Sequence, residues 1–348
     1  MNWTIVTAFP ESQLERRWRH FLERADYPAY HSSPDYFRDA FLQNRDAFAV
    51  LATDGGEVAG VLTGVRSGST IDCGHSGCPQ VCMLARGDHD QIAAALALGL
   101  KQHARRTASL VSVYSWVDSD AFGRAGFRRR VFAGGDKGIV VLDLARGKDV
   151  LFNEFSRTRR NEIKQAIRNA VDVSPLDCDK EFEAFYRIYQ DWCAFKDIAP
   201  ESPAVLAHAF SQTGNRLVLA ARHDGVLIAV STWRFQRNGV IEYAANWSRR
   251  AETKAHPNVL LVWRAIEWAV DEGFQTFSMG ASHFFLQSFG GEIVPTYRFT
   301  LDRTLLKRHH FRDTASAFAL RLFRRMPDAV RRLTKRLAEE SPAARAQV

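Results

Sequence analysis

The pattern of apolar and polar positions divides residues 1–147 into strands and helices. Apolar, β-branched runs predict strands, and apolar residues that recur every three or four positions predict amphipathic helices. Asp54, Gly55 and Gly56 separate two such runs and predict a hairpin. The predicted elements are a strand at residues 3–7, helices at about 11–24 and 34–44, strands at 47–53 and 57–65, a helix at 89–105, a strand at 110–114, a short helix near 118–125 and a strand at 138–144.

Residues 148–302 repeat a similar order of elements. The clearest is a helix from about Pro257 to Asp271 with one apolar face, followed by Gly273 where a helix-ending glycine belongs. The repeated order indicates an internal duplication, without a residue-level repeat to accompany it. The predicted elements are helices at about 156–169 and 180–195, a strand near 171–174, a helix after Pro203, a meander of strands at 216–222, 226–234 and 239–245, the helix at 257–271, and strands at 275–278 and 296–301.

The last 46 residues differ from the rest in charge and pattern. Twelve Lys or Arg and four acids lie from Arg303 to Val348, which accounts for the formal net charge of +8. Apolar residues recur there every three or four positions, so amphipathic helices are predicted. The default interpretation is packing on the protein's own domains. Contact with an anionic membrane surface and contact with an RNA backbone are the alternatives.

The composition indicates which class of protein this is. Hydrophobic residues make up 46% of the chain and charged residues 25%, as in ordinary globular proteins. The basic charge belongs to the tail alone and does not indicate a nucleic-acid-binding fold. Without a long apolar run or a signal-peptide pattern, we expect a cytoplasmic protein.

The cysteines do not suggest a disulfide framework, because their number is odd. Cys73, His75, Cys78 and Cys82 place four soft ligands within ten residues. Their spacing is not that of a zinc knuckle or ribbon, so we expect buried or inert thiols and no metal site.

Three stretches of the second half resemble the Fem aminoacyltransferases, the enzymes of peptidoglycan bridges, and their GNAT-fold relatives. The basic helix Ser156–Ala166 is similar to the family's "R-x-x-I-R-x-A" helix, and His256–Ala269 is similar to its "P-N-x-L-L-x-W-x-A-I-x-W-A" helix. Phe277–Gly280 and Phe285–Glu292 are similar to its "F-D-F-G" strand and "F-K-x-x-F-G-G" turn. Ser278 and Leu286 depart from this pattern, because many relatives have an acid and a lysine there.

The resemblance implies an α/β (α+β) fold of two tandem GNAT-like domains, each with a mixed, mostly antiparallel sheet flanked by helices. The expected boundaries are 1–147 for the first domain, 148–302 for the acyltransferase domain and 303–348 for a basic helical tail. It also implies acyl transfer to an amine. That reaction needs a proton acceptor and donors that stabilise an oxyanion, which GNAT folds place beside a splayed central strand.

On this interpretation the splayed strand is 239–245. Glu242 and Tyr243 are the candidates for handling the proton, with Ser278 and Ser282 across the cleft. The alternative for Glu242 is an outward-facing strand carboxylate, and for Tyr243 an aromatic of the core or of the cleft wall. The substrate-binding residues expected from the matched motifs are Arg159, Arg160, Lys164, Asn258, Ser282, Phe289, Gly290 and Gly291.

Arg160 and Lys164 lie one helical turn apart and, with Arg159, predict a phosphate clamp. A solvated basic face is the alternative. The linker at 246–255 contains no glycine, which disfavours the pyrophosphate loop of an acetyl-CoA enzyme. Leu286 in place of the lysine disfavours aminoacyl-tRNA, so both donors remain open.

The predicted function is therefore an N-acyltransferase that moves an acyl or aminoacyl group to an amine of a cell-envelope or polysaccharide precursor. No cofactor is expected to stay bound. The expected partners are a nucleotide- or lipid-linked precursor, tRNA if it is the donor, and the inner face of the membrane. The alternatives are an acyl-CoA-dependent enzyme acting on an amino sugar or small amine, and an inactive GNAT-like module that docks on membrane or RNA.

Overall fold

Two β-sheets with helices on both faces make up the part of the chain that the computed structural model describes, residues 1–42, 45–74, 80–132, 138–280 and 284–315. The first sheet contains β1 (Asn2–Val6), β2 (Asp46–Asp54), β3 (Glu57–Ser67), β4 (Thr70–Cys73), β5 (Val81–Met83), β6 (Leu110–Ser115), β7 (Arg128–Phe132) and β15 (Thr296–Asp302). The second contains β8 (Ile139–Asp143), β9 (Asp172–Pro175), β10 (Arg216–His223), β11 (Val226–Phe235), β12 (Val240–Ser248), β13 (Thr276–Ser278) and β14 (Glu292–Val294). The strand orders are β1-β2-β3-β4-β6-β15-β7, with β5 beside β3, and β14-β8-β13-β12-β11-β10-β9. Most neighbouring strands are antiparallel, whereas β4 and β6 pair in parallel, as do β12 and β13.

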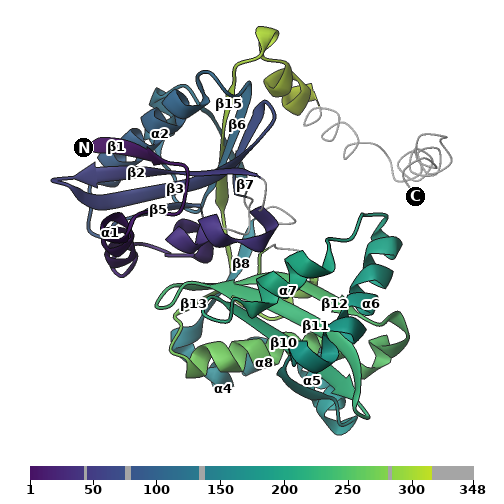
Figure 1. Cartoon of the computed structure of the whole chain (residues 1–348). Coiled ribbons are helices and arrows are strands. Elements are labelled where there is room, and N and C mark those ends of the chain that lie inside the picture. Colours follow the sequence, from purple (N-terminus) through teal and green to yellow (C-terminus); the bar gives the residue numbers. More distant parts are fainter. Residues whose placement is uncertain (43–44, 75–79, 133–137, 281–283, 316–348) are drawn as a thin grey trace, which may run out of the picture.

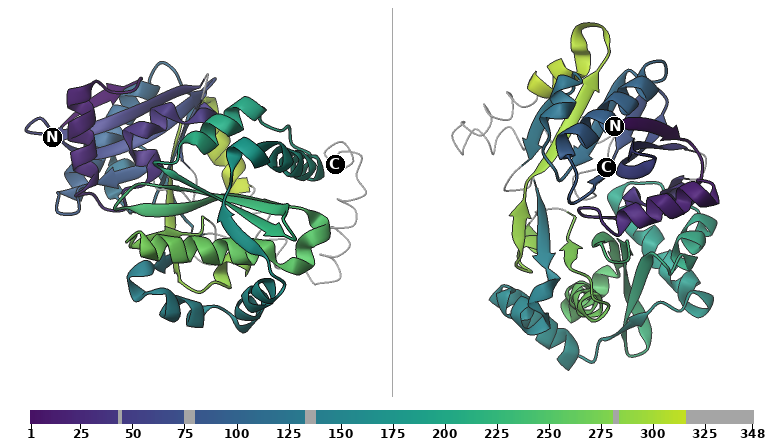
Figure 2. Two further views of the ribbon diagram at one scale, coloured as in Figure 1. Left: turned by 60° about the horizontal axis from the view of Figure 1, so that its bottom comes forward. Right: turned by 90° about the vertical axis from the view of Figure 1, so that its left-hand side faces the viewer.

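Helices cover both faces of each sheet (Figures 1 and 2), which explains why central strands are apolar on both sides. In β2, Val50 packs in the cluster with α2 and Leu51 in the cluster with α1. In β10, Leu219 packs in the cluster with α5 and α8, and Val218 in the cluster with α6 and α7. The helices are α1 (Ser12–Leu22), α2 (His89–Ala104), α3 (Asp120–Arg124), α4 (Lys148–Glu154), α5 (Arg157–Arg168), α6 (Cys178–Lys196), α7 (Pro203–Ser211), α8 (Pro257–Asp271) and α9 (Phe284–Gln287).

The predicted elements of both halves are confirmed except at residues 34–44. The helix predicted there is wrong: the described residues form short 3₁₀ helices, η1 (Tyr30–Ser32), η2 (Pro34–Arg38) and η3 (Ala40–Leu42). Ser33 before the proline and Asp39 both have extended backbones, which interrupts a helix on either side of η2. The tail predicted from residue 303 is described only to residue 315, where residues 308–315 are helical.

The two sheets exchange strands across the boundary that the sequence suggests at residue 147. β8, expected in the first unit, pairs with β13 and β14 in the second sheet. β15, expected in the second unit, pairs with β6 and β7 in the first sheet and runs upward through it in Figure 1. Only Pro295 separates β14 from β15. The chain therefore crosses between the sheets twice, which ties the domains together.

The segment from Pro28 to Leu42 forms a further connection, because it leaves the first sheet and lies against the second. Val240 at the start of β12 donates its backbone N–H to Pro28 O at 2.8 Å. A Cβ at Gly239 would lie 2.0 Å from the same oxygen. Glycine is therefore required there for close backbone approach.

Gly239→Ala tests this contact. We expect the free energy of unfolding to fall by about 1–3 kcal/mol, because the carbonyl of Pro28 must move away from β12. Denaturant unfolding measures it. Gly214→Ala is the matched control, since a Cβ there meets nothing within 4 Å. Equal stability of the two variants would contradict the contact.

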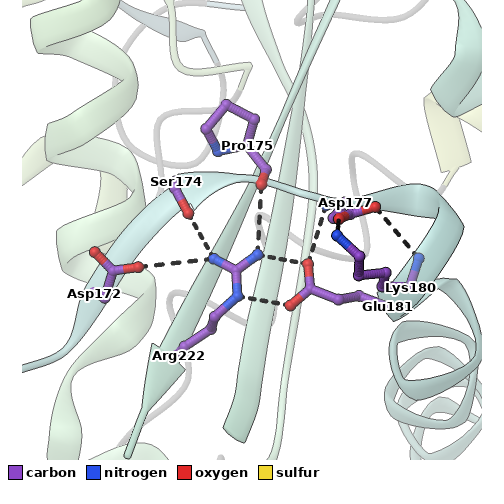
Figure 3. A network of polar contacts seen from close by, with 7 residues as sticks. All are labelled: Asp172, Ser174, Pro175, Asp177, Lys180, Glu181 and Arg222. Carbon is purple, nitrogen blue, oxygen red and sulfur yellow. Dashed lines mark hydrogen bonds and ion pairs between the residues drawn. The ribbon is translucent and has the colours of Figure 1, made fainter. Parts of the chain in front are cut away.

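Arg222 of β10 fixes the start of α6 on the second sheet (Figure 3). Its Nε donates to Glu181 Oε1 at 2.6 Å, and its Nη1 donates to Ser174 Oγ of β9 at 2.7 Å. Glu181 also accepts the N–H of Asp177, the N-cap residue of α6, at 3.0 Å. The hydrogen bonds from Arg222 lower the pKa of Glu181. One guanidinium thus joins two strands to a helix.

Glu181→Gln should destabilise the protein by about 1–2 kcal/mol at pH 7, because a charge-assisted pair is lost. The folded-state pKa of Glu181 lies below its unfolded value of about 4.3, so this stability is present above that pH and is lost as the pH falls through the folded pKa. Denaturant unfolding of the unchanged protein and of Glu181→Gln between pH 7 and pH 3 measures this. The difference in their free energies of unfolding should shrink as the pH falls. Glu183→Gln is the control: its side chain is 81% exposed, and an effect under about 0.5 kcal/mol is expected. A pH-independent difference would contradict the role of the charge.

Candidate functional site

β12 and β13 separate in the middle of the second sheet. They pair in parallel over three positions, from Val240 opposite Thr276 to Glu242 opposite Ser278. Beyond this, Met279 donates its N–H to Val140 O of β8, whereas β12 continues beside β11 as far as Ser248. The central strand therefore leaves its neighbour immediately after Glu242.

A bulge lies next to this point. Thr232 of β11 is opposite Ala245 and Trp233 is opposite Tyr243, so Ala244 is an extra residue in β12. Bulges re-aim side chains and are frequent beside active sites. On the β13 side, Gly280 has a φ of +82° and lies close to β12. A Cβ at Gly280 would be 3.5 Å from Tyr243 O.

Four polar side chains form a row across the sheet at the same level. Arg216 of β10 is opposite Arg234 of β11, Arg234 is opposite Glu242, and Glu242 is opposite Ser278. Arg216 is 4% exposed, and Glu242 and Ser278 are fully buried. Residues paired directly across strands project from the same face, so two cations, a carboxylate and a hydroxyl lie side by side in a buried layer.

The Pro28–Leu42 segment of the first domain covers this row. His31 Nε2 and Arg234 Nε each lie 3.9 Å from Glu242 Oε2, and Asp39 Oδ2 lies 3.9 Å from Arg216 Nη2. Thr63 donates its hydroxyl to His31 O at 2.6 Å and fixes the backbone of that histidine. The site is therefore built from both domains.

Tyr30 and Tyr36 flank the imidazole of His31, with ring centroids 5.3 and 5.7 Å away. Burial raises the pKa of both phenols well above the usual value, so both stay protonated. Burial, and after it the charge of Arg234, lowers the pKa of Arg216. Its Nε and Nη2 are buried and make no hydrogen bond to atoms of the described residues. Asp39 partly balances this charge.

Residues 157–288, from α5 to α9, match the family described as an acetyltransferase (GNAT) domain. The second domain belongs to the GNAT superfamily. The strand predicted at 239–245 to be the splayed one is β12, which leaves β13 after Glu242. Among curated proteins, none matches the chain by sequence.

The described part of the chain has the fold of tandem GNAT proteins. The structure of FemX is similar over 87% of this chain and 98% of its own, with a TM-score of 0.65 and 12% identity. L-PGS from Bacillus licheniformis is similar over 86% and 93%, with a TM-score of 0.52 and 12% identity. A tandem GNAT protein from the clavulanic acid biosynthesis pathway is similar over 87% and 99%, with a TM-score of 0.53 and 12% identity. The predicted fold class is confirmed.

The predicted catalytic residues of the GNAT domain separate into two groups. Glu242 and Ser278 are adjacent in the buried row, and Ser278 Oγ accepts the N–H of Gly280 at 3.3 Å. Tyr243 projects from the opposite face, where its ring lies 6.3 Å from that of Trp233, and burial raises its pKa. Ser282 lies outside the described residues.

The basic residues of α5 lie on the α8 side of the GNAT sheet, away from Glu242. Arg159 Nε donates to Ser288 Oγ at 2.6 Å, and its guanidinium lies 4.4 Å from the Phe285 ring centroid. Arg160 Nη1 donates to Phe155 O at 2.8 Å. Both arginines hold α5 against its neighbours, while Lys164 is exposed. A phosphate clamp formed by these residues stays a prediction.

The other predicted substrate-binding residues shape the frame around the site. Asn258 Nδ2 donates to Ser248 Oγ at 3.2 Å and joins the end of β12 to α8. Phe289 is fully buried in the core. Gly290 and Gly291 have φ angles of +76° and +82°, and a Cβ at Gly291 would lie 2.6 Å from Val141 O. Their binding roles stay predictions.

The predicted cysteine cluster is only partly described. Cys73 and Cys82 are buried, and burial raises the pKa of both thiols. His75 and Cys78 lie outside the described residues. Within the described ranges, no group of three His, Cys, Asp or Glu residues is arranged to hold a metal.

Sequence reasoning missed His31, Asp39, Arg216 and Arg234. A signal for the arginines was available: each occupies a position in an apolar strand where alternation places a side chain inside the protein. No comparable pattern indicated His31, which lies outside the predicted elements, or Asp39, which lies in the helix predicted at about 34–44.

Asp39→Asn tests the charge balance of the row. The amide oxygen can still accept the Phe41 N–H, now 2.9 Å from Asp39 Oδ1, but Arg216 loses its negative neighbour. We expect a loss of about 3 kcal/mol in the free energy of unfolding, because a buried cation is left uncompensated. Asp35→Asn, which weakens a half-exposed pair with Arg19, should cost under about 1 kcal/mol. Similar losses in the two variants would contradict the prediction.

Proposed function

We propose that the protein is an N-acyltransferase that moves an acyl or aminoacyl group to an amine of a cell-envelope or polysaccharide precursor. The main support is the position of Glu242. It is fully buried, it lies where the central strand of a GNAT domain leaves its neighbour, and it faces the other domain. A carboxylate placed there can accept a proton beside an acyl group bound in the splay.

In the proposed reaction the neutral amine attacks the acyl carbonyl carbon, and the ester or thioester bond of the donor breaks. Glu242 takes the proton released by the amine. Ser278 on the next strand orients the acceptor, since its oxygen is already held by the N–H of Gly280. Tyr243 projects from the opposite face and packs against the apolar core there, which favours a packing role.

Arg216 supports an anionic acceptor. Buried N–H groups without hydrogen bonds are costly, and a phosphate or carboxylate would satisfy them. Phosphate groups of a nucleotide- or lipid-linked precursor have the required charge. We therefore assign recognition of the acceptor to the row itself, and not to α5.

Charged tRNA is the donor that the linker after β12 favours. Residues 250–255 form a 3₁₀ helix without glycine, where an acetyl-CoA enzyme needs a glycine-rich loop around the pyrophosphate. A second candidate is an acyl-CoA-dependent enzyme acting on an amino sugar or small amine. It is favoured by Leu286, which is 2% exposed and places no cation where relatives of the resembled family have a lysine.

The envelope substrate is supported by the fold shared with FemX and L-PGS. Such a precursor would place the protein in the cytoplasm, at the inner face of the membrane. The basic tail would then lie near its lipids.

The first experiment is a donor screen with the full chain, using labelled acyl-CoAs in one arm and charged tRNAs in the other, with amine acceptors present. Transfer from tRNA supports the primary proposal, and release of the CoA thiol supports the second candidate. Absence of binding and transfer with both donors would contradict both and favour an inactive docking module.

With the active donor, Glu242→Gln should lower kcat by about 10²–10⁴-fold, because the proton acceptor is removed, while donor binding persists. Single-turnover transfer and equilibrium binding measure the two quantities separately. Glu183→Gln on the surface of α6 should leave both unchanged. Normal kcat in Glu242→Gln would refute the role of Glu242.

A further inference from the structure

Large apolar side chains gather in solvent just after β15. Leu305 and Leu306 are each 84% exposed, and Phe311 is 75% exposed. The segment that follows β15 forms the yellow tip at the top of Figure 1, away from the second sheet. Single exposed apolar residues are ordinary, but adjacent leucines with almost their whole surface in water indicate an interaction site.

Hydrogen bonds hold this tip in a defined conformation. Asp302 Oδ1 accepts the N–H and hydroxyl of Thr304 at 3.0 and 2.6 Å, and its Oδ2 accepts the N–H of His310 at 2.9 Å. Burial alone would raise the pKa of Asp302, but these bonds outweigh it and lower the pKa to about 2. Leu306 has a φ of +61°, which is unfavourable for leucine. The turn thus presents both leucines outward, against the backbone preference of Leu306.

The surroundings of the leucines are cationic. Arg303, Lys307, Arg308 and Arg312 lie within ten residues that contain no acid. Two acids flank this stretch: the carboxylate of Asp302 is bonded within the turn, and Asp313 is 3.7 Å from Arg298. Exposed apolar side chains with cations close to them in the chain match the lipid–water interface of an anionic bilayer.

A groove of about 530 Å³ beside the tip is also lined by apolar and cationic side chains. Arg303 belongs to both, and the groove's other residues are apolar, cationic or amide-bearing, without a carboxylate. They are Trp3, Leu98, Lys101, Gln102, Arg105 and Leu301. Leu98 is 51% exposed and Trp3 is 37% exposed. Tryptophan and basic side chains are typical of protein surfaces that meet lipid headgroups.

We propose that the tip at residues 303–312 and this groove dock the protein on an anionic phospholipid bilayer. The leucines enter the outer part of the acyl-chain layer, and the arginines and lysine contact lipid phosphates. The leucines favour lipid over RNA, because RNA would engage the cations without using apolar side chains. Among the described residues no helix is long and apolar enough to cross a bilayer, so contact through them is peripheral. This docking does not depend on the acyl-transfer reaction.

Sedimentation of the full chain with vesicles tests the proposal. Vesicles contain phosphatidylcholine alone or phosphatidylcholine with about one third phosphatidylglycerol. We expect binding to the anionic vesicles, and a partition coefficient about tenfold lower for Leu305→Ser/Leu306→Ser. Arg308→Gln/Arg312→Gln should weaken binding to anionic vesicles and remove most of its dependence on salt.

The matched control is Ile167→Ser/Val226→Ser, which alters two half-exposed apolar residues of the second domain and should bind like the unchanged protein. Thermal unfolding checks that the leucine variant keeps its fold, as expected for side chains outside the core. Vesicle binding that is equal with and without the two leucines would overturn the proposal. So would binding of tRNA in place of vesicles through the same cations.

Discussion

Burial of a charged row on the second sheet is the constraint on which the arrangement of the domains depends. Arg216, Arg234 and Glu242 occupy matching positions on three central strands, with side chains on one face. Removing such charges from water costs several kcal/mol for each ion unless opposite charges and polar groups accompany them. The first domain supplies two such groups. Asp39 lies 3.9 Å from Arg216, and His31 lies 3.9 Å from Glu242. The sheet of the GNAT domain is therefore completed electrostatically by the other domain.

The backbone enforces the same relation. The exchange of β8 and β15 between the sheets makes each domain incomplete without a strand from the other half of the chain. The contact between Gly239 and Pro28 then brings the covering segment to the first residue of β12. Because Glu242 follows two residues later, the distance from His31 to Glu242 is set by both the strand exchange and this contact. A site built in this way can bind a large acceptor between two domains while holding its reacting groups on strands.

In a duplicated fold the two domains can have different functions. The second domain has the splay, the bulge and the buried carboxylate. The first contributes a covering segment to that site and, at the far end of β15, presents the exposed leucines and cations. In this arrangement the surface proposed to meet the bilayer and the residues proposed to transfer the acyl group belong to one connected body.

The sequence by itself determined most of the helices and strands, because local patterns such as the apolar face of 257–271 and its terminal Gly273 depend only on residues near in the chain. It also indicated the GNAT fold and Glu242, through short motifs and the order of elements. It could not decide that β8 and β15 change sheets, since an apolar strand fits the interior of either one. Only the tertiary structure decided that residues 34–42 are short 3₁₀ helices rather than one α-helix, and that His31 lies beside Glu242. Those outcomes depend on contacts between residues some 200 positions apart in the chain, which no local pattern of hydrophobic and polar positions encodes.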